Sequence, residues 1–281
     1  MSRTLPFARF FLAGLALLIV LTEVATSAAG EPISPTEKIA LFNGTDLTGW
    51  YTWLQDTKYE DPRKVFTVHD GMVHISGDGL GCITTKEAYR DYHLIVEVKW
   101  GERTWHGRTM KTKDSGVLVH SFGEDGAHGG IWMRSIEAQL IEGGFGDFIV
   151  VTGGKQNPEE LSITAEIKLD RDKEKVWYKG GEKTLVAGGR VNWFGRDEDW
   201  KDVKGFRGRN DVESPDGEWT RMDVICEGGK ITNIVNGVVV NQAFDVKPTA
   251  GKIQIQTELA ECFLRRIELW PIGKAPAFEK K

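Results

Sequence analysis

The chain has 281 residues, with 36 Lys and Arg against 41 Asp and Glu, which gives a formal net charge of −5. A mildly acidic chain is a poor candidate for binding nucleic acid or an anionic membrane through charge. Its length suits one all-β domain of roughly 200–250 residues. The 10 Trp residues are a high count, and they serve either as core side chains or as surfaces on which sugar rings stack.

The N-terminus has the pattern of a secretory signal peptide. Arg3 and Arg9 form a basic start, residues 10–21 are an apolar run, and Ser27-Ala28-Ala29 offers small side chains to signal peptidase. The apolar run is short for a membrane span, which needs ~20 residues. We therefore expect residues 1–29 to be removed and the mature protein to be exported to the periplasm or the outside, without a membrane anchor. An uncleaved N-terminal anchor is the alternative.

The next part of the chain consists of short predicted strands joined by turns. Residues 30–37 are a linker, and one domain is expected over residues 38–271, followed by a tail at 272–281. The first predicted elements are a strand and turn over 39–50, a hairpin over 65–76, and strands over 80–85, 93–100 and 114–120, with polar loops at 101–113 and 121–130.

Residues 135–142 form the most informative of these predicted strands. Ile136, Ala138 and Leu140 alternate with Glu137 and Gln139, which is the period of a half-buried strand. The alternation slips at Leu140-Ile141. A one-residue bulge there would return Glu142 to the face of Glu137 and Gln139. An early end of the strand, or a partner for Glu142, is the alternative, because an unpaired buried carboxylate is costly.

The second half of the chain contains two segments of different composition. Residues 155–218 are rich in charged residues and Gly, and they predict a long insertion with a few short strands, such as 163–169 and 175–178. Five further strands are expected over 219–226, 230–235, 238–243, 252–256 and 262–270. The Asn236-Gly237 pair between two apolar runs is a strong hairpin signal. This pattern predicts an all-β fold, an antiparallel two-sheet β-sandwich of the jelly-roll, concanavalin A-like or glucanase-like kind.

The three cysteines are an odd number, so at least one is free. Cys226 and Cys262 lie in late predicted strands, and export would permit a bridge between them, with Cys82 left over. The chain has no C-x-x-C spacing, which argues against a zinc site built on cysteine.

Four motifs together resemble those of the 3-keto-disaccharide hydrolase family, formerly a domain of unknown function. They are Leu41-Phe42-Asn43-Gly44 through Gly49-Trp50, then Asp114-Ser115-Gly116-Val117, then Ile136-Glu137-Ala138-Gln139-Leu140 followed by Gly146-Asp147, and Gly217-Glu218-Trp219 leading to Val235-Asn236-Gly237. The resemblance spans nearly all of residues 38–271. It implies a concanavalin A-like sandwich and a carbohydrate-active protein that works on 3-oxo-glycosides as hydrolase or lyase.

The chemistry of such a substrate directs the choice of candidate residues. A ketone at C3 acidifies the proton on C2, so a base removes that proton, the C1 substituent leaves with acid assistance, and water adds back. The candidate catalytic residues are Glu137, Glu142 and His120, with Arg134 placed to polarise the ketone. The other candidate substrate-binding residues are Gln139 for a hydroxyl, Trp132 for stacking, and Asp114 and Asp147. We expect Trp132, Arg134 and His120 on the rim of a concave pocket lined by Glu137.

Other functions remain open at this point. Asp114, His120, Glu137 and Asp147 carry oxygen and nitrogen donors, but they lack a fixed ligand spacing, so no cofactor is predicted and a divalent metal is left open. The spacing Glu137-x-Gln139-x-x-Glu142 resembles the Glu-x-Asp-x-x-Glu strand of retaining glucanases, with Gln in place of the middle Asp. A lectin-like binding module and an adhesion domain share the expected fold. The expected partner in the enzymatic and lectin-like hypotheses is a carbohydrate.

Overall fold

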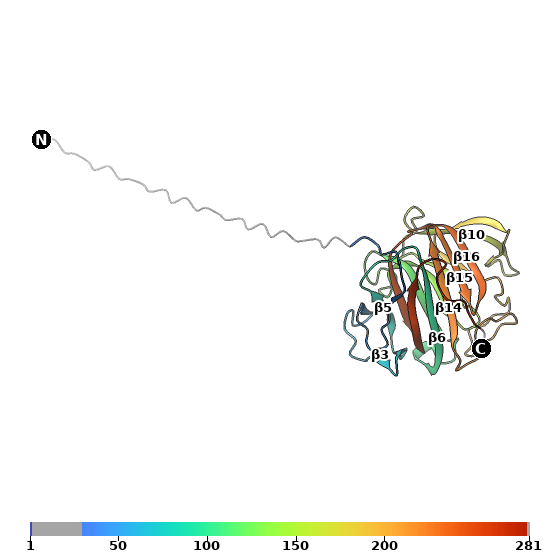
Figure 1. The fold of residues 1–281 in the computed structure, drawn as a ribbon, viewed down its shortest axis with the longest axis horizontal. Helices are drawn as coiled ribbons and strands as arrows, with labels where there is room; N and C mark the ends of the chain where they lie inside the picture. Colours follow the sequence, from blue (N-terminus) through green and yellow to red (C-terminus); the bar gives the residue numbers. More distant parts are fainter. Residues whose placement is uncertain (2–29, 280–281) are drawn as a thin grey trace.

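The computed structural model describes residue 1 and residues 30–279. The predicted signal peptide, residues 1–29, lies outside the described residues apart from residue 1. The described chain consists of two antiparallel sheets, with 11 and 7 strands. Figure 1 looks onto the molecule with β6, β14, β15, β16 and β10 of the eleven-stranded sheet side by side.

The chain crosses repeatedly between the two sheets and places one to three consecutive strands in each before it crosses again. The eleven-stranded sheet contains β1 (Ile39–Ala40), β3 (Phe66–His69), β4 (Met72–Ile75), β6 (Tyr92–Thr104), β10 (Ser162–Leu169), β11 (Lys175–Trp177), β12 (Glu182–Val186), β14 (Thr220–Glu227), β15 (Lys230–Val235), β16 (Val238–Lys247) and β18 (Ala260–Trp270). The seven-stranded sheet contains β2 (Trp50–Leu54), β5 (Leu80–Thr85), β7 (Asp114–Phe122), β8 (Arg134–Ile141), β9 (Phe148–Val151), β13 (Gly189–Val191) and β17 (Lys252–Glu258). A short 3-10 turn, η1 (His106–Arg108), lies in the loop between β6 and β7.

The predicted fold class is confirmed, and so are most of the predicted strands. The order in the seven-stranded sheet is β13-β9-β8-β7-β17-β5-β2. Asn236 and Gly237 both have positive φ, 46° and 81°, and they close the β15–β16 hairpin as the sequence predicts. Within the described part of the chain, no helix has the length and apolar character needed to cross a bilayer.

The segment over residues 155–218 adds to both sheets rather than standing apart from them. Strands β10, β11 and β12 extend one end of the eleven-stranded sheet, and β13 extends the seven-stranded sheet at β9. Residues 192–219 contain no named strand and run as a long loop. This loop approaches the end of β8, since the Trp193 backbone amide donates to Asp147 and the Trp200 indole donates to the carbonyl of Glu142.

Alternation along β8 separates a core face from a polar face. Ile136, Ala138 and Leu140 are fully or almost fully buried in the core with Val117 and Val119 of β7. The other face of β8 carries Glu137 and Gln139. The seven-stranded sheet therefore holds its polar side chains on the face turned away from the eleven-stranded sheet.

The predicted bulge at Leu140-Ile141 is wrong. The β7–β8 register is continuous from Asp114 opposite Ile141 to Val119 opposite Ile136, and it shifts only between Val119 and Phe122 of β7. Strand β8 ends at Ile141, and Glu142 begins a turn. The early strand end was the stated alternative, and it removes the need for a bulge because Glu142 no longer follows the alternation.

The Cys226–Cys262 bridge that export would permit is absent from the described residues, since all three cysteines are free and buried. Cys226 lies opposite Tyr92 on one side of β6, and Cys262 lies opposite Trp100 on its other side. Those two β6 residues are separated by roughly 27 Å along the strand at ~3.4 Å per residue. A disulfide needs Cα atoms within about 7 Å.

Candidate active site

Glu137 and Gln256 converge over a glycine in the middle of the seven-stranded sheet. Gly116 of β7 lies opposite Gln139 of β8, and on its other side it neighbours Gln256 of β17. A Cβ at Gly116 would lie 2.2 Å from Oε1 of Glu137 and 2.6 Å from Oε1 of Gln256. Only a residue without a side chain leaves room for both groups, so Gly116 forms the floor of this site.

The carboxyl group of Glu137 lies in an environment that keeps it protonated. Its residue is 3% exposed. Burial, with a smaller effect from the carboxylate of Asp114, raises the pKa of Glu137 to about 8, against the lowering effects of Arg190 and a hydrogen bond with Gln256. A group with this pKa is mostly protonated at neutral pH and can donate its proton.

An acidic pair lies on the same face, at the start of β7 and the end of β17. Asp114 and Glu258 share the guanidinium of Arg108, with Nη2 at 3.0 Å from Asp114 and 3.2 Å from Glu258. The side-chain amide of Gln139 donates to Oδ1 of Asp114 at 3.1 Å. Burial raises the pKa of both carboxyl groups, and the charge of Asp114 raises that of Glu258 further. The single cation between two carboxylates favours a state in which the pair retains one proton.

Two arginines hold Asp147 at the β8–β9 side. Oδ2 of Asp147 accepts from Nη1 of Arg190 at 2.7 Å and from Nη1 of Arg196 at 2.5 Å, and Oδ1 accepts from the backbone amide of Trp193 at 2.7 Å. The carbonyl of Asp147 accepts from the amide of Gln139 at 3.0 Å. Asp147 is therefore a fully buried anchor that places Arg190 beside the polar face.

The structure brings together four of the residues singled out from the sequence. Glu137, Gln139 and Asp114 lie on the polar face of adjacent strands, and Asp147 follows directly at the turn into β9. Their proximity follows from the antiparallel register of β7 and β8.

Glu142 is placed elsewhere. It is fully buried, and its Oε2 accepts from the backbone amides of Lys113 at 2.9 Å and Gly205 at 2.8 Å, while Oε1 lies 3.5 Å from Nζ of Lys113. Because β8 ends before it, Glu142 turns into the loops and ties them together. It does not form a pair with Glu137.

His120 lies in the core rather than on the polar face, because the β7–β8 register shifts between Val119 and Phe122. It has a φ of 53°, is fully buried, and its ring packs edge-on against Tyr92 of the opposite sheet at 6.2 Å between centroids. Its Nδ1 is 2.8 Å from the carbonyl of Pro248. Burial lowers the pKa of His120 to about 4, so it is a neutral core histidine on the other side of the sheet.

The remaining two predicted residues do not reach Glu137. Arg134 begins β8 at the far end from Gln139, with Nη1 at 2.7 Å from Glu160 and its guanidinium over the ring of Phe122. The indole of Trp132 donates to the carbonyl of Gly81 in β5 at 3.0 Å. Trp132 therefore lies over a strand that is three positions from β8, roughly 14 Å away at ~4.8 Å per strand.

Several residues of the site were missed in the sequence. Gln256 and Glu258 belong to the alternating run Gln254-Ile255-Gln256-Thr257-Glu258, in which polar side chains repeat with period two, and that signal could have identified them. Arg108 and Arg190 carry no comparable local signal. They reach the site only because the loop after β6 and strand β13 fold back onto the sheet.

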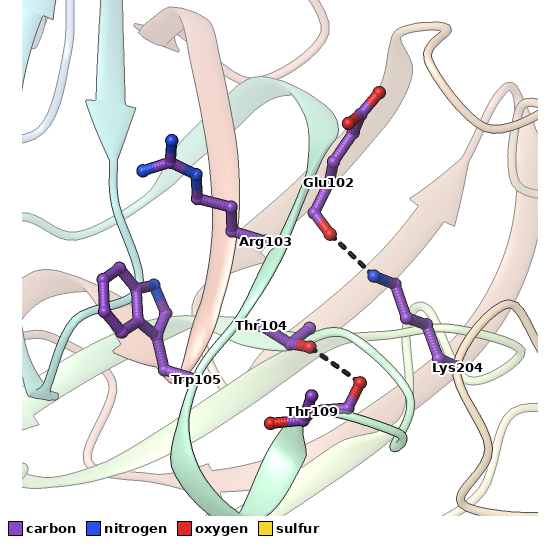
Figure 2. A pocket seen from close by; sticks show the side chains of 6 residues that line it. All are labelled: Glu102, Arg103, Thr104, Trp105, Thr109 and Lys204. Atoms are coloured by element: carbon purple, nitrogen blue, oxygen red, sulfur yellow. Dashed lines mark hydrogen bonds between the residues drawn. The ribbon is translucent and has the colours of Figure 1, made fainter.

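Two cavities lie near the site. The first, about 350 Å³, is formed by residues 102–105, Thr109 and Lys204, and Figure 2 shows the Lys204 ammonium bound to the carbonyl of Glu102. The second, about 270 Å³, includes Arg190, Arg196 and Trp200 in its lining. Neither lining includes Glu137, so the predicted concave pocket around that residue is not among these two cavities.

The candidate metal ligands do not form one cluster. Asp114, Glu137 and Asp147 face the polar side of the sheet, whereas His120 faces the core. Among the described residues, no group of three or more His, Cys, Asp or Glu side chains is arranged to hold a metal ion.

A family model for the 3-keto-alpha-glucoside-1,2-lyase-like domain matches residues 37–269, most of the chain. The chain belongs to this family. Family membership makes it a carbohydrate-active, glycosyl hydrolase-like protein. The match also includes residues 155–218, so this segment is part of the family domain. None of the curated proteins gives a significant match.

Solved structures with a similar outline share little sequence with this member of the family. A candidate glycosyl hydrolase from Parabacteroides distasonis has 16% identity over 84% of this chain and 94% of its own, with a TM-score of 0.48. A carbohydrate-binding module from Bacillus subtilis has 12% identity over 80% and 97%, with a TM-score of 0.39. A β-glucanase from Bacillus licheniformis has 12% identity over 83% and 96%, also with a TM-score of 0.39.

Proposed function

We propose that this protein is an exported enzyme that cleaves the glycosidic bond of 3-oxo-glycosides by deprotonation at C2, elimination and water addition. The observation that carries the proposal is Glu137, a buried carboxyl group whose pKa is raised to about 8. It lies beside the acidic pair of Asp114 and Glu258 and beside two side-chain amides. A site that must both accept and donate a proton near neutral pH requires such a division between carboxyl groups.

In the proposed first step, the Asp114–Glu258 pair accepts the C2 proton. The electron pair of the C–H bond forms the C1–C2 double bond, and the C1–O bond breaks. Glu137 donates its proton to the departing oxygen, which leaves as an alcohol. Arg190, which is near Glu137 and Asp114 and still one-third exposed at its side chain, stabilises the negative charge that develops on the ketone oxygen.

In the second step, water adds across the double bond. Glu137, now ionised, takes one proton from the water, the oxygen bonds to C1, and the acidic pair returns its proton to C2. The sum is hydrolysis of the glycoside, and both acidic groups regain their starting protonation states. Gln139 and Gln256 offer amide groups for sugar hydroxyls on the same face. If the product leaves before water adds, the same residues perform a lyase reaction.

The placement of Glu142 bears on the glucanase-like alternative. Retaining glycosidases use two carboxyl groups about 5–5.5 Å apart, one of them as nucleophile. In this protein, Glu142 is held by Lys113 and Gly205, and the position between it and Glu137 is Gln139. The elimination route needs no carboxylate nucleophile, so it fits the residues on this face better.

The decisive variant is Glu137→Gln, compared with Glu213→Gln. Glu213 is a matched control, because it is also a buried glutamate whose pKa burial raises well above the usual value, but it accepts from the amide of Gly143 in the loop region. We expect Glu137→Gln to keep the fold and to reduce turnover of 3-oxo-glycosides by roughly 10²–10⁴-fold. The Glu213→Gln variant should retain turnover near that of the wild type. Turnover by each variant is measured as product release from a panel of 3-oxo-glycosides and plain glycosides.

Two outcomes would contradict the proposal. Full turnover by Glu137→Gln would remove Glu137 from the mechanism. Binding of sugars by the wild type without turnover of any 3-oxo-glycoside would favour a lectin-like module. Export is a separate part of the proposal, supported by the leader pattern of residues 1–29, and N-terminal sequencing of the protein from its native host would test it.

A further inference from the structure

The cavity of about 270 Å³ shares Arg190 with the candidate active site. Arg190 and Arg196 line it, and both bind Asp147 with their Nη1 atoms. The carbonyl of Asp147 accepts from the backbone amide of Gln139, and the side-chain amide of Gln139 donates to Asp114. Asp147 and Gln139 therefore connect the lining to Asp114. One wall of this cavity is therefore continuous with the acid–base face of the seven-stranded sheet.

The lining offers an aromatic surface together with hydrogen-bond donors. The guanidinium of Arg196 lies 4.3 Å from the ring of Trp200, and Trp200 is itself held by the bond from its indole to the carbonyl of Glu142. Arg190 and Arg196 each use one nitrogen on Asp147 in the contacts named above, which leaves further guanidinium N–H groups as donors. Because Asp147 holds both arginines in place, their guanidinium groups are fixed hydrogen-bond donors in the lining of the cavity.

Five carboxylates also line the cavity, together with the two arginines. Asp170 accepts from the backbone amides of Asp172 and Glu174 at 2.9 and 2.8 Å, and Glu174 accepts from the side-chain amide of Asn192 at 2.7 Å. Among the carboxylates of the lining, Asp172 is paired with Arg171 at 3.1 Å and Asp197 with Arg209 at 3.2 Å. Glu198 is exposed, and no side-chain bond is recorded for it within residues 30–279. The excess of carboxylates disfavours an anionic ligand, and the two guanidinium groups disfavour a cationic one. The lining therefore favours a ligand that both donates and accepts hydrogen bonds.

We propose that this cavity is a subsite for one uncharged, hydroxyl-rich sugar ring of the substrate, adjacent to Glu137. This inference rests on the proposed function, since it assigns the cavity to the same glycoside. Its volume is just below that of pockets for drug-sized ligands, about 300–1,000 Å³, which suits a single ring rather than a chain. Sugar hydroxyls pair with the arginine donors and the carboxylate acceptors, and the apolar face of the ring packs near Trp200.

The test compares Glu198→Ala with Glu102→Ala. Both glutamates lie on a cavity rim, and neither has a side-chain bond recorded in the described part of the chain, but Glu102 lines the other cavity. We expect Glu198→Ala to raise KM for a 3-oxo-disaccharide several-fold with kcat nearly unchanged, and Glu102→Ala to change neither. A hydroxyl acceptor at the subsite affects binding of the ring in the ground state and the transition state alike.

A second measurement does not depend on turnover. In the Glu137→Gln variant, α,α-trehalose and methyl α-D-glucoside should shift the indole N–H resonance of Trp200, which a Trp200→Phe variant identifies. Glu198→Ala should weaken that titration several-fold. Sodium acetate and methylammonium chloride are the charged probes, and they should give no saturable shift.

The outcomes separate the subsite from the proposed function. A saturable shift of Trp200 that Glu198→Ala weakens, without turnover of 3-oxo-glycosides, retains the sugar subsite and overturns the function. Turnover with no shift of Trp200 and an unchanged KM in Glu198→Ala overturns the subsite and retains the function. Tighter binding of acetate or methylammonium than of the sugars overturns the assignment to an uncharged ring.

Discussion

At the scale of single residues, the partners of a buried carboxyl group determine its role at this site. Glu137 and Glu142 belong to the same segment and are both buried. The pKa of Glu137 is raised to about 8. Glu142 accepts two backbone N–H bonds and lies near Lys113, whereas the neighbours of Glu137 include the carboxylate of Asp114. Glu137 is therefore able to donate a proton near neutral pH, whereas Glu142 ties backbone segments of the loops together.

The raised pKa of Glu137 predicts that the stability of the protein depends on pH. The folded-state pKa of Glu137 lies above the unfolded value of 4.5, so its proton favours the folded state, and that contribution is lost as pH rises from about 4.5 to about 8. Glu137→Gln removes this titration. The free energy of unfolding of the variant should therefore rise relative to the wild type across this range, by on the order of a few kcal/mol in total.

Urea unfolding at pH 5, 6, 7 and 8 measures this effect, with Glu60→Gln as an exposed control that should show no such trend. A constant difference between Glu137→Gln and the wild type at all four pH values would show that the carboxyl group titrates normally.

At the scale of elements, the register of β7 against its two neighbours assembles the site. Gly116 of β7 lies between Gln139 of β8 and Gln256 of β17, and the absence of a side chain there lets Glu137 and Gln256 lie over the backbone. The irregularity farther along β7 turns His120 into the core. One strand therefore both leaves room for the carboxyl group of Glu137 and turns away His120, which the sequence had suggested as a base.

Gly116→Ala should disturb the site more than the fold. The atoms closest to the added Cβ are the ends of the Glu137 and Gln256 side chains, which can move, so the loss of stability should stay near the lower end of the ~1–3 kcal/mol range for overpacking. Turnover should fall by at least about tenfold, because displacement of a catalytic group by an ångström is costly.

Gly107→Ala is the matched control, since a Cβ at Gly107 meets no atom within 4 Å. Steady-state kinetics and thermal unfolding of both variants provide the comparison. Wild-type turnover by Gly116→Ala would show that the position of the Glu137 carboxyl group over β7 is unimportant.

At the scale of the whole molecule, the order of strands decides which distant residues meet. In the eleven-stranded sheet, β6 separates β14 from β18, and this keeps Cys226 and Cys262 apart although both lie in the last third of the chain. Burial raises the pKa of each of the three thiols to about 12, which suppresses the reactive thiolate.

We therefore expect the native protein to contain three unreactive thiols and no disulfide. A thiol reagent such as dithionitrobenzoate should label no cysteine in the folded protein and three in urea, and dithiothreitol should leave the Tm unchanged. A lowered Tm in dithiothreitol, or fewer than three thiols in urea, would contradict the strand order described above.

The sequence by itself determined the β class, most of the strands, the Asn236-Gly237 hairpin and the two faces of β8, because each follows from the chemistry of neighbouring residues. It also carried the family motifs and pointed to Glu137, Gln139, Asp114 and Asp147. Only the tertiary structure decided that Gln256, Glu258, Arg108 and Arg190 join them, and that Glu142, His120 and Arg134 do not. Strand order, the end of β8 and the irregularity in β7 depend on pairing between segments that are far apart in the chain, and local alternation contains no information about such pairing.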